Sequence, residues 1–212
     1  MLRFMLAVVV WILSANAAGA TDFRSFDTST YSQAVTECDR QAAHPDDPHK
    51  VIRGLESSEM DMPAAIAACE AALKADPDNP RIVYQLARAL TYAGRVKEGL
   101  PVIERAASMD YPQALFVTGY LYLSGAYDAP KDACRAAELI RRSAILGRLA
   151  GQVGFPAYFL EGRFAGCPVK QDPAEMVSML EAAKTTKLDY YAGLLVSTLL
   201  RQLRAADTLT ND

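Results

Sequence analysis

Small and apolar residues recur three and four positions apart along most of the chain, which is the spacing of helices that bury one face. Ala65, Cys69 and Ala72 share one face of the first clear helix. Pro77 ends that helix, and Pro80 suits the first position of the next one. The pattern therefore predicts an all-α chain of short amphipathic helices joined by turns.

The next two helices form a hairpin around Gly94. Apolar residues line one face of a helix from about Pro80 to Ala93, namely Val83, Leu86, Ala87 and Leu90. Facing positions on the returning helix are small or apolar, namely Gly99, Ile103 and Ala106. Small side chains facing larger ones let two antiparallel helices pack closely, so the sequence predicts a helical hairpin here.

Residues 65 to 112 resemble the tetratricopeptide repeat nearly position for position. The departures are Val83, where the family usually has Trp, and Gly99, where it usually has Ala. The resemblance implies an α-solenoid of antiparallel helix hairpins, a fold whose usual role is to hold other proteins.

After Pro112 the spacing resembles the Sel-one-like repeat, a slightly longer relative of the tetratricopeptide unit. The residues that carry this resemblance are Ala114, Gly119, Tyr122, Gly125, Ala137, Ala144 and Gly147. Phe159 and Gly162 begin a more degenerate second copy. The apolar stretch from Leu188 to Arg204 then predicts a helix that caps the last hairpin.

These patterns predict one helical-repeat domain after a short leader. The predicted parts are a signal peptide at 1–20 and a domain at 21–212, divided into an atypical first hairpin with a long loop (21–79), a tetratricopeptide repeat (80–112), two Sel-one-like repeats (113–187) and a capping helix (188–206).

The first 20 residues have the three parts of a secretory signal. One basic residue, Arg3, precedes an apolar run from Phe4 to Leu13, and Ala18 to Ala20 supplies small residues for cleavage. The apolar run is short for a transmembrane span. We therefore expect export, to a bacterial periplasm or otherwise by secretion, with no stable membrane insertion after cleavage. An uncleaved N-terminal anchor is the alternative.

Charge narrows the class of partner. The chain of 212 residues carries a net charge of −3, which becomes about −4 when cleavage removes Arg3. A mildly acidic chain gives no reason to expect a nucleic acid partner or an electrostatic attachment to a membrane.

Four cysteines, none in a Cys-x-x-Cys pair, favour structural disulfides in an exported chain. Four cysteines allow three pairings. Cys38 lies on a helix predicted from about Ser29 to Ala42, and a bridge to Cys69 would staple the first hairpin across its long loop. Cys134 and Cys167 fall on the same edge of the stack, so we expect the second bridge to join them. The resemblance also implies bridges of this kind, and a free reactive thiol is the alternative.

The candidate chemistry is limited to one loop. His44 and His49 flank Asp46 and Asp47, and these side chains could bind zinc or another divalent metal. The two prolines in the loop indicate a solvated linker as the simpler interpretation. No Ser-x-x-Lys motif, nucleophile elbow or glycine-rich phosphate loop is present. The sequence therefore predicts no catalytic residues, no metal site and no cofactor.

In tetratricopeptide arrays the first helix of each hairpin lines a concave groove, and the resemblance implies the same here. Arg81, Tyr84 and Arg88 share one helix face. Guanidinium groups bind carboxylates in pairs and tyrosine adds flat contact area, so this face suits an extended peptide that carries carboxylates. The full predicted groove comprises Arg81, Tyr84, Arg88, Thr91, Tyr92, Gln113, Phe116 and Tyr120. Alternatively, the aromatic side chains only pack between repeats and the arginines are solvated.

The sequence thus predicts an exported, non-enzymatic scaffold or adaptor that binds a protein or peptide in its concave groove. One alternative is a cell-envelope enzyme or metal-binding protein that uses the loop from His44 to His49. A second alternative is a purely structural subunit of a larger assembly.

Overall fold

The computed structural model describes residues 23–210, and the predicted signal peptide at 1–20 lies outside this range. Within the described range the regular structure is helical. The α-helices are α1 (Glu37–Ala42), α2 (Met62–Ala75), α3 (Pro80–Tyr92), α4 (Val96–Ser108), α5 (Pro112–Ser124), α6 (Ala133–Ile145), α7 (Leu149–Leu160), α8 (Pro173–Ala183) and α9 (Tyr190–Thr210). Three short 3-10 turns, η1 (Thr28–Thr30), η2 (Ser57–Glu59) and η3 (Ala126–Asp128), complete the set.

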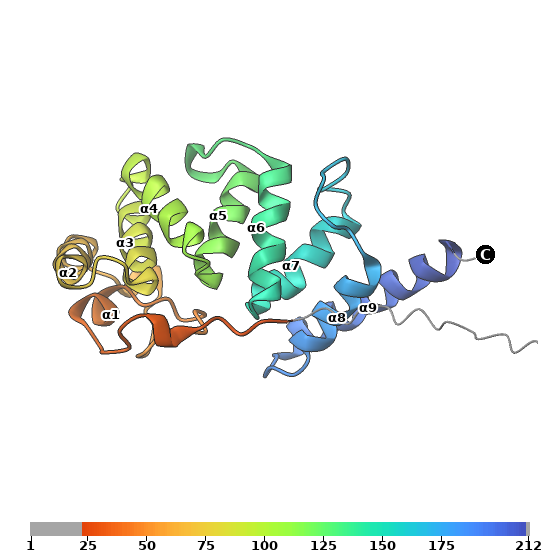
Figure 1. The fold of residues 1–212 in the computed structure, drawn as a ribbon, viewed down its shortest axis with the longest axis horizontal. Helices are drawn as coiled ribbons and strands as arrows, with labels where there is room; N and C mark the ends of the chain where they lie inside the picture. Colours follow the sequence, from red (N-terminus) through yellow and green to blue (C-terminus); the bar gives the residue numbers. More distant parts are fainter. Residues whose placement is uncertain (1–22, 211–212) are drawn as a thin grey trace, which may run out of the picture.

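Successive helices pack against each other in antiparallel pairs. Helices α3 and α4, α5 and α6, and α7 and α8 form hairpins that stack side by side into an elongated array (Figure 1). Helix α9 packs against α8 and α7 at the far end. The predicted fold class, an all-α solenoid of helix hairpins, is confirmed.

The helices begin where short polar side chains cap them. Each capping oxygen accepts a hydrogen bond from a backbone N–H of the first turn, and the caps of this type are Asp61 (α2), Asn79 (α3), Asp132 (α6) and Asp172 (α8). Proline in the first turn of α2, α3 and α8 adds a fixed φ without the loss of a helical hydrogen bond. These local signals explain why the helix starts can be read from the sequence.

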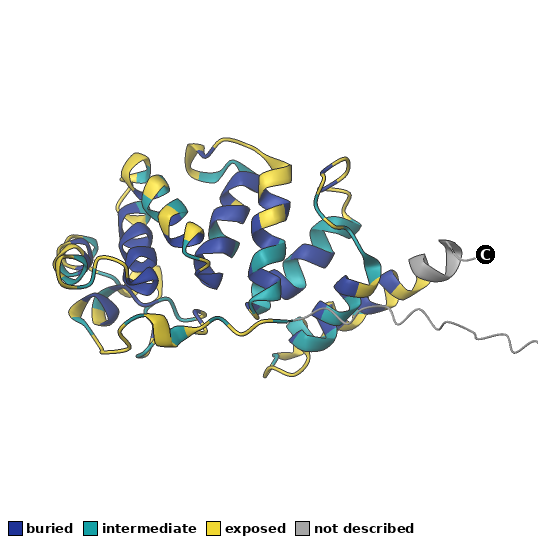
Figure 2. Cartoon of the chain, viewed as in Figure 1, coloured by how far each residue is buried: buried dark blue, intermediate teal, exposed yellow. Residues whose placement is uncertain are grey.

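Close helix contact depends on small residues. A Cβ on Gly119 of α5 would lie 2.6 Å from Ile140 Cγ1 and 3.1 Å from the backbone oxygen of Ala136, both on α6. The two helices can therefore approach only because position 119 lacks a side chain. Figure 2 shows the buried residues concentrated where α3, α5 and α6 face their neighbours.

The helix predicted from Ser29 to Ala42 is wrong over its first half, because α1 begins only at Glu37. Thr36 and Asp39 form a reciprocal capping box, in which Asp39 N–H donates to Thr36 Oγ1 (3.2 Å) and Thr36 N–H donates to Asp39 Oδ2 (2.8 Å). This cap starts the helix at residue 37, and residues 31–36 stay outside it.

Two disulfides connect neighbouring elements. Cys38 of α1 is bonded to Cys69 of α2, and Cys134 of α6 is bonded to Cys167 in the loop between α7 and α8. Both bridges expected from the sequence are present. Within residues 23–210, no helix combines the length and the apolar character that crossing a membrane requires.

Removal of the first bridge should destabilise the fold. The Cys38–Cys69 bond closes a loop with a sequence separation of 31 residues, and its loss restores conformational entropy to the unfolded chain. We expect Cys38→Ser with Cys69→Ser to lower the free energy of unfolding by about 3 to 4 kcal/mol in urea titrations. A loss below about 1 kcal/mol would mean that the bridge does not constrain this hairpin.

Candidate partner-binding site on the inner face

The residues before α2 cover much of the inner face, the face made by α3, α5 and α7. Residues 23–60, here called the N-terminal segment, run along the lower side of the array in Figure 1, from the neighbourhood of α7 back to α1. At one end, the backbone N–H of Arg24 donates to the oxygen of Ile145, the last residue of α6 (3.1 Å). Further along, α1 packs on α3. Enclosed by the N-terminal segment, α2 and α4, every residue of α3 from Pro80 to Leu90 is buried.

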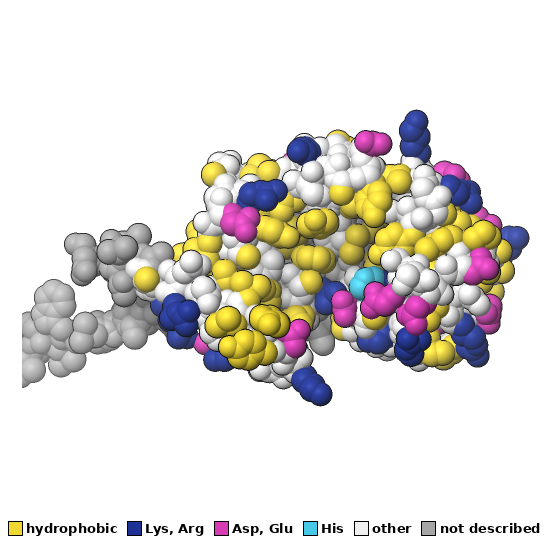
Figure 3. Space-filling view, turned by 180° about the vertical axis from the view of Figure 1, so that it is seen from behind, with side chains coloured by type: hydrophobic (Ala, Val, Ile, Leu, Met, Phe, Trp, Pro, Cys, Tyr) yellow, Lys and Arg dark blue, Asp and Glu magenta, His cyan; other side chains and the backbone are white. Residues whose placement is uncertain are grey.

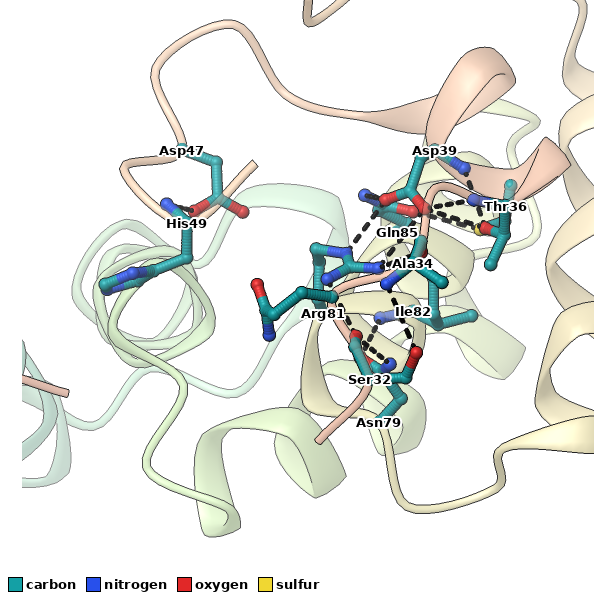
Figure 4. A network of polar contacts seen from close by, with 12 residues as sticks. Ser32, Ala34, Thr36, Asp39, Asp47, His49, Asn79, Arg81, Ile82 and Gln85 are labelled. Carbon is teal, nitrogen blue, oxygen red and sulfur yellow. Dashed lines mark hydrogen bonds and ion pairs between the residues drawn. The ribbon is translucent and has the colours of Figure 1, made fainter. Parts of the chain in front are cut away.

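One arginine of α3 holds the middle of the N-terminal segment (Figure 4). The Arg81 side chain pairs with the Asp39 carboxylate of α1, with Nε 2.8 Å from Oδ1, and both side chains are fully buried. Its terminal nitrogens donate to the backbone oxygens of Ser32 and Ala34, each at 3.1 Å. Gln85 Nε2 donates to the same carboxylate at 2.9 Å. These contacts fix an extended stretch of backbone against α3.

The Asp39 carboxylate remains ionised despite its burial. Burial alone opposes the charge, but hydrogen bonds from Thr36 and Gln85 together with the positive charge of Arg81 outweigh it and lower the pKa of Asp39. Buried ion pairs are favourable only when the remaining polar groups are also satisfied. Here all three guanidinium nitrogens of Arg81 have partners, so the pair meets that condition.

A second arginine of α3 closes the loop that follows α1. Arg88 Nη1 donates to the oxygens of Ala42 and Ala43 at 3.0 and 2.9 Å, and Nη2 donates to that of Leu55 at 2.6 Å. The loop returns on itself at Gly54, where a Cβ would lie 2.3 Å from the backbone nitrogen of Pro45. Arg88 therefore fastens both ends of the loop to the array.

The loop from His44 to His49 packs on the protein through Asp47 and His49, whereas Asp46 and Pro48 are exposed, so it is not the fully solvated linker that the sequence suggested. Asp47 is 1% exposed, and its carboxylate accepts hydrogen bonds from the Tyr111 hydroxyl (2.6 Å) and the His49 backbone N–H (2.9 Å). Burial raises the pKa of Asp47 against the effect of these bonds. The His49 ring contacts Phe26 and Tyr111, with centroids 5.1 and 6.1 Å away.

His44 lies at the edge of this packed loop. Its Nδ1 accepts a hydrogen bond from the Asp46 backbone N–H at 3.0 Å. Burial, followed by the charge of Arg88, lowers the pKa of His44 to about 4, so the imidazole is neutral near pH 7. In the part of the chain that the structure describes, no group of three or more His, Cys, Asp or Glu side chains is arranged to hold a metal ion.

Four of the predicted groove residues do not offer a free surface. Arg81, Tyr84, Arg88 and Gln113 are buried, with at most 5% of each exposed, because the N-terminal segment and neighbouring side chains cover them. The prediction that Arg81 and Arg88 bind carboxylates of a partner is therefore wrong, since their guanidinium groups already hold the protein's own backbone. Solvated arginines, the alternative, are excluded for the same reason.

The other four residues of the predicted set remain accessible. Tyr92 and Tyr120 are exposed over 39% and 45% of their surfaces, and Thr91 and Phe116 are partly exposed. Tyr127, which the sequence did not single out, is 50% exposed. The accessible part of the inner face is thus rich in tyrosine.

Three of these tyrosines surround a cavity of about 220 Å³, here called the hollow. Its walls come from α3 (Tyr84, Arg88, Thr91 and Tyr92), α4 (Ile103), α5 (Val117, Tyr120 and Leu121), η3 (Tyr127) and the loop after α1 (His44). Figure 3 shows hydrophobic side chains gathered around the hollowed face, with a histidine at its edge. The hollow is therefore aromatic, with a single charged side chain, Arg88, that is 5% exposed.

A larger depression of about 1060 Å³ lies between the N-terminal segment and α2. Methyl groups of α2 form its floor, namely those of Ala68, Ala71, Ala72 and Ala75. Its other walls carry polar side chains, among them Ser29, Glu37 and Asp76, but Tyr31 is the only aromatic residue in the lining. The hollow, where tyrosines from three elements converge, is the better candidate for a binding site.

Comparison with known proteins agrees with the regular part of the fold. The Tetratricopeptide repeat family model matches residues 58–115, which include α2, α3 and α4. No curated protein and no solved structure shows significant similarity to the chain. The match indicates a protein-interaction repeat, and no enzyme family was found.

Breaking the buried ion pair should destabilise the fold. Arg81→Met leaves the Asp39 carboxylate buried without its cation, which typically costs about 3 to 5 kcal/mol. We expect a loss of this size in urea unfolding and a partial recovery in the double variant Arg81→Met with Asp39→Asn, which removes the unpaired charge. The matched control is Arg105→Met, because Arg105 and its partner Asp78 are largely exposed and should contribute less than about 1 kcal/mol. Equal effects of the two single variants would contradict this role of Arg81.

Proposed function

We propose that the chain is an exported, non-enzymatic scaffold that binds a protein or peptide partner in the hollow of its inner face. The observation that carries this proposal is the exposure of Tyr92, Tyr120 and Tyr127 around the hollow, on a face that the N-terminal segment otherwise covers. Tyrosine is enriched in binding surfaces because it adds a large apolar contact and a polar hydroxyl at low entropic cost. The tetratricopeptide match supports a protein partner.

We propose a single domain over 21–212 in which 21–79 form an atypical first hairpin, 80–112 a tetratricopeptide repeat, 113–187 two Sel-one-like repeats and 188–206 a cap. The hairpins α5–α6 and α7–α8 fall within the two Sel-one-like units, which supports this division.

Export is the second part of the proposal. Two disulfides in a chain with no other cysteines favour an oxidising compartment, and residues 1–20 have the composition of a signal peptide. A bacterial periplasm fits both features. The net charge of −3 favours neither nucleic acid nor an anionic membrane as a partner.

The alternative, a cell-envelope enzyme or metal-binding protein that uses the loop from His44 to His49, has little structural support. Asp47 is buried and bonded to Tyr111, and Nδ1 of His44 is occupied by the Asp46 backbone. These contacts commit the loop to packing the inner face.

Partner capture should depend on the exposed tyrosines. We expect crosslinking from an envelope extract, read out by mass spectrometry, to recover a specific partner with the wild-type chain and to lose it with Tyr92→Ser and Tyr120→Ser combined. Both side chains are well exposed, so the fold should survive, which circular dichroism can verify.

The control for partner capture is Tyr190→Ser with Tyr191→Ser. These two tyrosines of α9 are 77% and 78% exposed and lie outside the hollow. This variant should keep the partner. Recovery of the same partner by the Tyr92 and Tyr120 variant would show that binding takes place elsewhere.

A further inference from the structure

We propose that the hollow recognises an uncharged, extended segment rich in proline on the partner protein. This inference rests on the proposed function and specifies the chemistry of its ligand. Three features of the hollow support it: the shielding of its one charged side chain, its size, and the tyrosine hydroxyls and strained loop at its rim.

The first feature is the shielding of the one charged side chain in the lining, Arg88, whose Nε is buried without a partner. Both terminal nitrogens of Arg88 donate to backbone oxygens of the N-terminal segment, and only 5% of the residue is exposed. His44 is neutral near pH 7 because burial lowers its pKa to about 4. An acidic ligand side chain would lose hydration while the Arg88 cation is only 5% exposed, and a basic one would find no carboxylate in the lining, so the hollow disfavours both acidic and basic segments.

The second feature is size. One turn of an α-helix of about 10 Å diameter fills about 400 Å³, which is more than the hollow of about 220 Å³ can hold. The walls are helices and helix connections, so they offer no sheet edge to which a strand could be added. An extended segment that inserts two or three side chains matches the space. Aromatic-lined grooves commonly bind such segments in the polyproline II conformation, which is already stiff and loses little entropy on binding.

The third feature is the set of tyrosine hydroxyls. Within residues 23–210, the hydroxyls of Tyr92, Tyr120 and Tyr127 make no side-chain hydrogen bond that would occupy them. A polyproline segment has carbonyl oxygens with no internal partners, and it has no backbone N–H at its prolines. The tyrosine hydroxyls can donate to these carbonyl oxygens, and the tyrosine rings can pack against the apolar proline rings.

The backbone at the rim gives independent support. Tyr127 and Asp128 in η3 have φ values of 55° and 59°, in the left-handed region that bulky residues rarely adopt. Of the six other left-handed positions in the described residues, five are glycines, as sterics would favour, namely Gly94, Gly125, Gly147, Gly162 and Gly166, and the sixth is the small polar residue Asp110. A large aromatic at such a position is costly for the fold, and backbone strain of this kind clusters at functional sites. The Tyr127 side chain lines the hollow, so a role in binding explains why a tyrosine occupies this strained position.

A binding measurement with defined peptides tests the inference. The full chain with both disulfides intact is titrated, by isothermal calorimetry, with octaproline that is acetylated and amidated at its ends. Comparison peptides of equal length are a blocked Gly-Ser repeat and a blocked Glu-Pro repeat. We expect octaproline to bind at least tenfold more tightly than either, because only octaproline is both stiff and uncharged.

Variants then locate the binding site. Tyr120→Ala and Tyr127→Asn should each weaken octaproline binding at least tenfold, whereas Tyr190→Ala should leave it unchanged. Asn tolerates left-handed backbone, so Tyr127→Asn should not lower the melting temperature, and a loss of binding cannot then be attributed to unfolding. Absence of octaproline binding, binding that survives Tyr120→Ala, or preference for the Glu-Pro peptide would each overturn the inference.

The inference and the proposed function fail in distinguishable ways. If partner capture depends on Tyr92 and Tyr120 but octaproline does not bind, the scaffold function stands and the proline-rich ligand is rejected. If partner capture survives the loss of both tyrosines, the hollow is not the binding site and both are rejected.

Discussion

The arrangement of the inner face depends on the buried ion pair between Arg81 of α3 and Asp39 of α1. The pair is fully buried, so it is stable only while every polar atom around it has a partner, and backbone oxygens of the N-terminal segment supply those partners. The segment and the pair therefore require each other. The Cys38–Cys69 bond holds α1 beside α2 and keeps Asp39 close to Arg81.

Because the N-terminal segment covers part of the inner face, a partner can bind only to the part that stays exposed. In this chain the inner surface of α3 is committed to the N-terminal segment, and the free surface moves to the C-terminal end of α3, to α5 and to η3. Of the two arginines that would attract an acidic peptide, Arg81 is paired with the Asp39 carboxylate, and Arg88 is buried with its terminal nitrogens bonded to backbone oxygens. What remains is an aromatic hollow whose one charged side chain, Arg88, is 5% exposed, and its chemistry differs from that suggested by the arginines alone.

Local signals made the array predictable. Capping residues such as Asn79, prolines in first turns and small residues such as Gly119 act within a few positions or across one helix pair, so the hairpins and both disulfides could be anticipated. The covering of α3 could not, because it depends on contacts 42 to 49 residues apart in sequence, such as those of Arg81 with Asp39 and Ser32. The sequence offers only an indirect clue, the long loop between the helices that carry Cys38 and Cys69. Tyr127 was missed since nothing in its local sequence indicates a left-handed backbone.

The most direct test of this account is tyrosine nitration of the native protein, mapped residue by residue with mass spectrometry. If the N-terminal segment covers the inner face, Tyr92, Tyr120 and Tyr127, which are 39% to 50% exposed, are nitrated rapidly. Tyr84 and Tyr111, which are at most 2% exposed, are protected. Modification of Tyr84 and Tyr111 at rates similar to those of the exposed three would contradict it, because the N-terminal segment would then not cover the inner face.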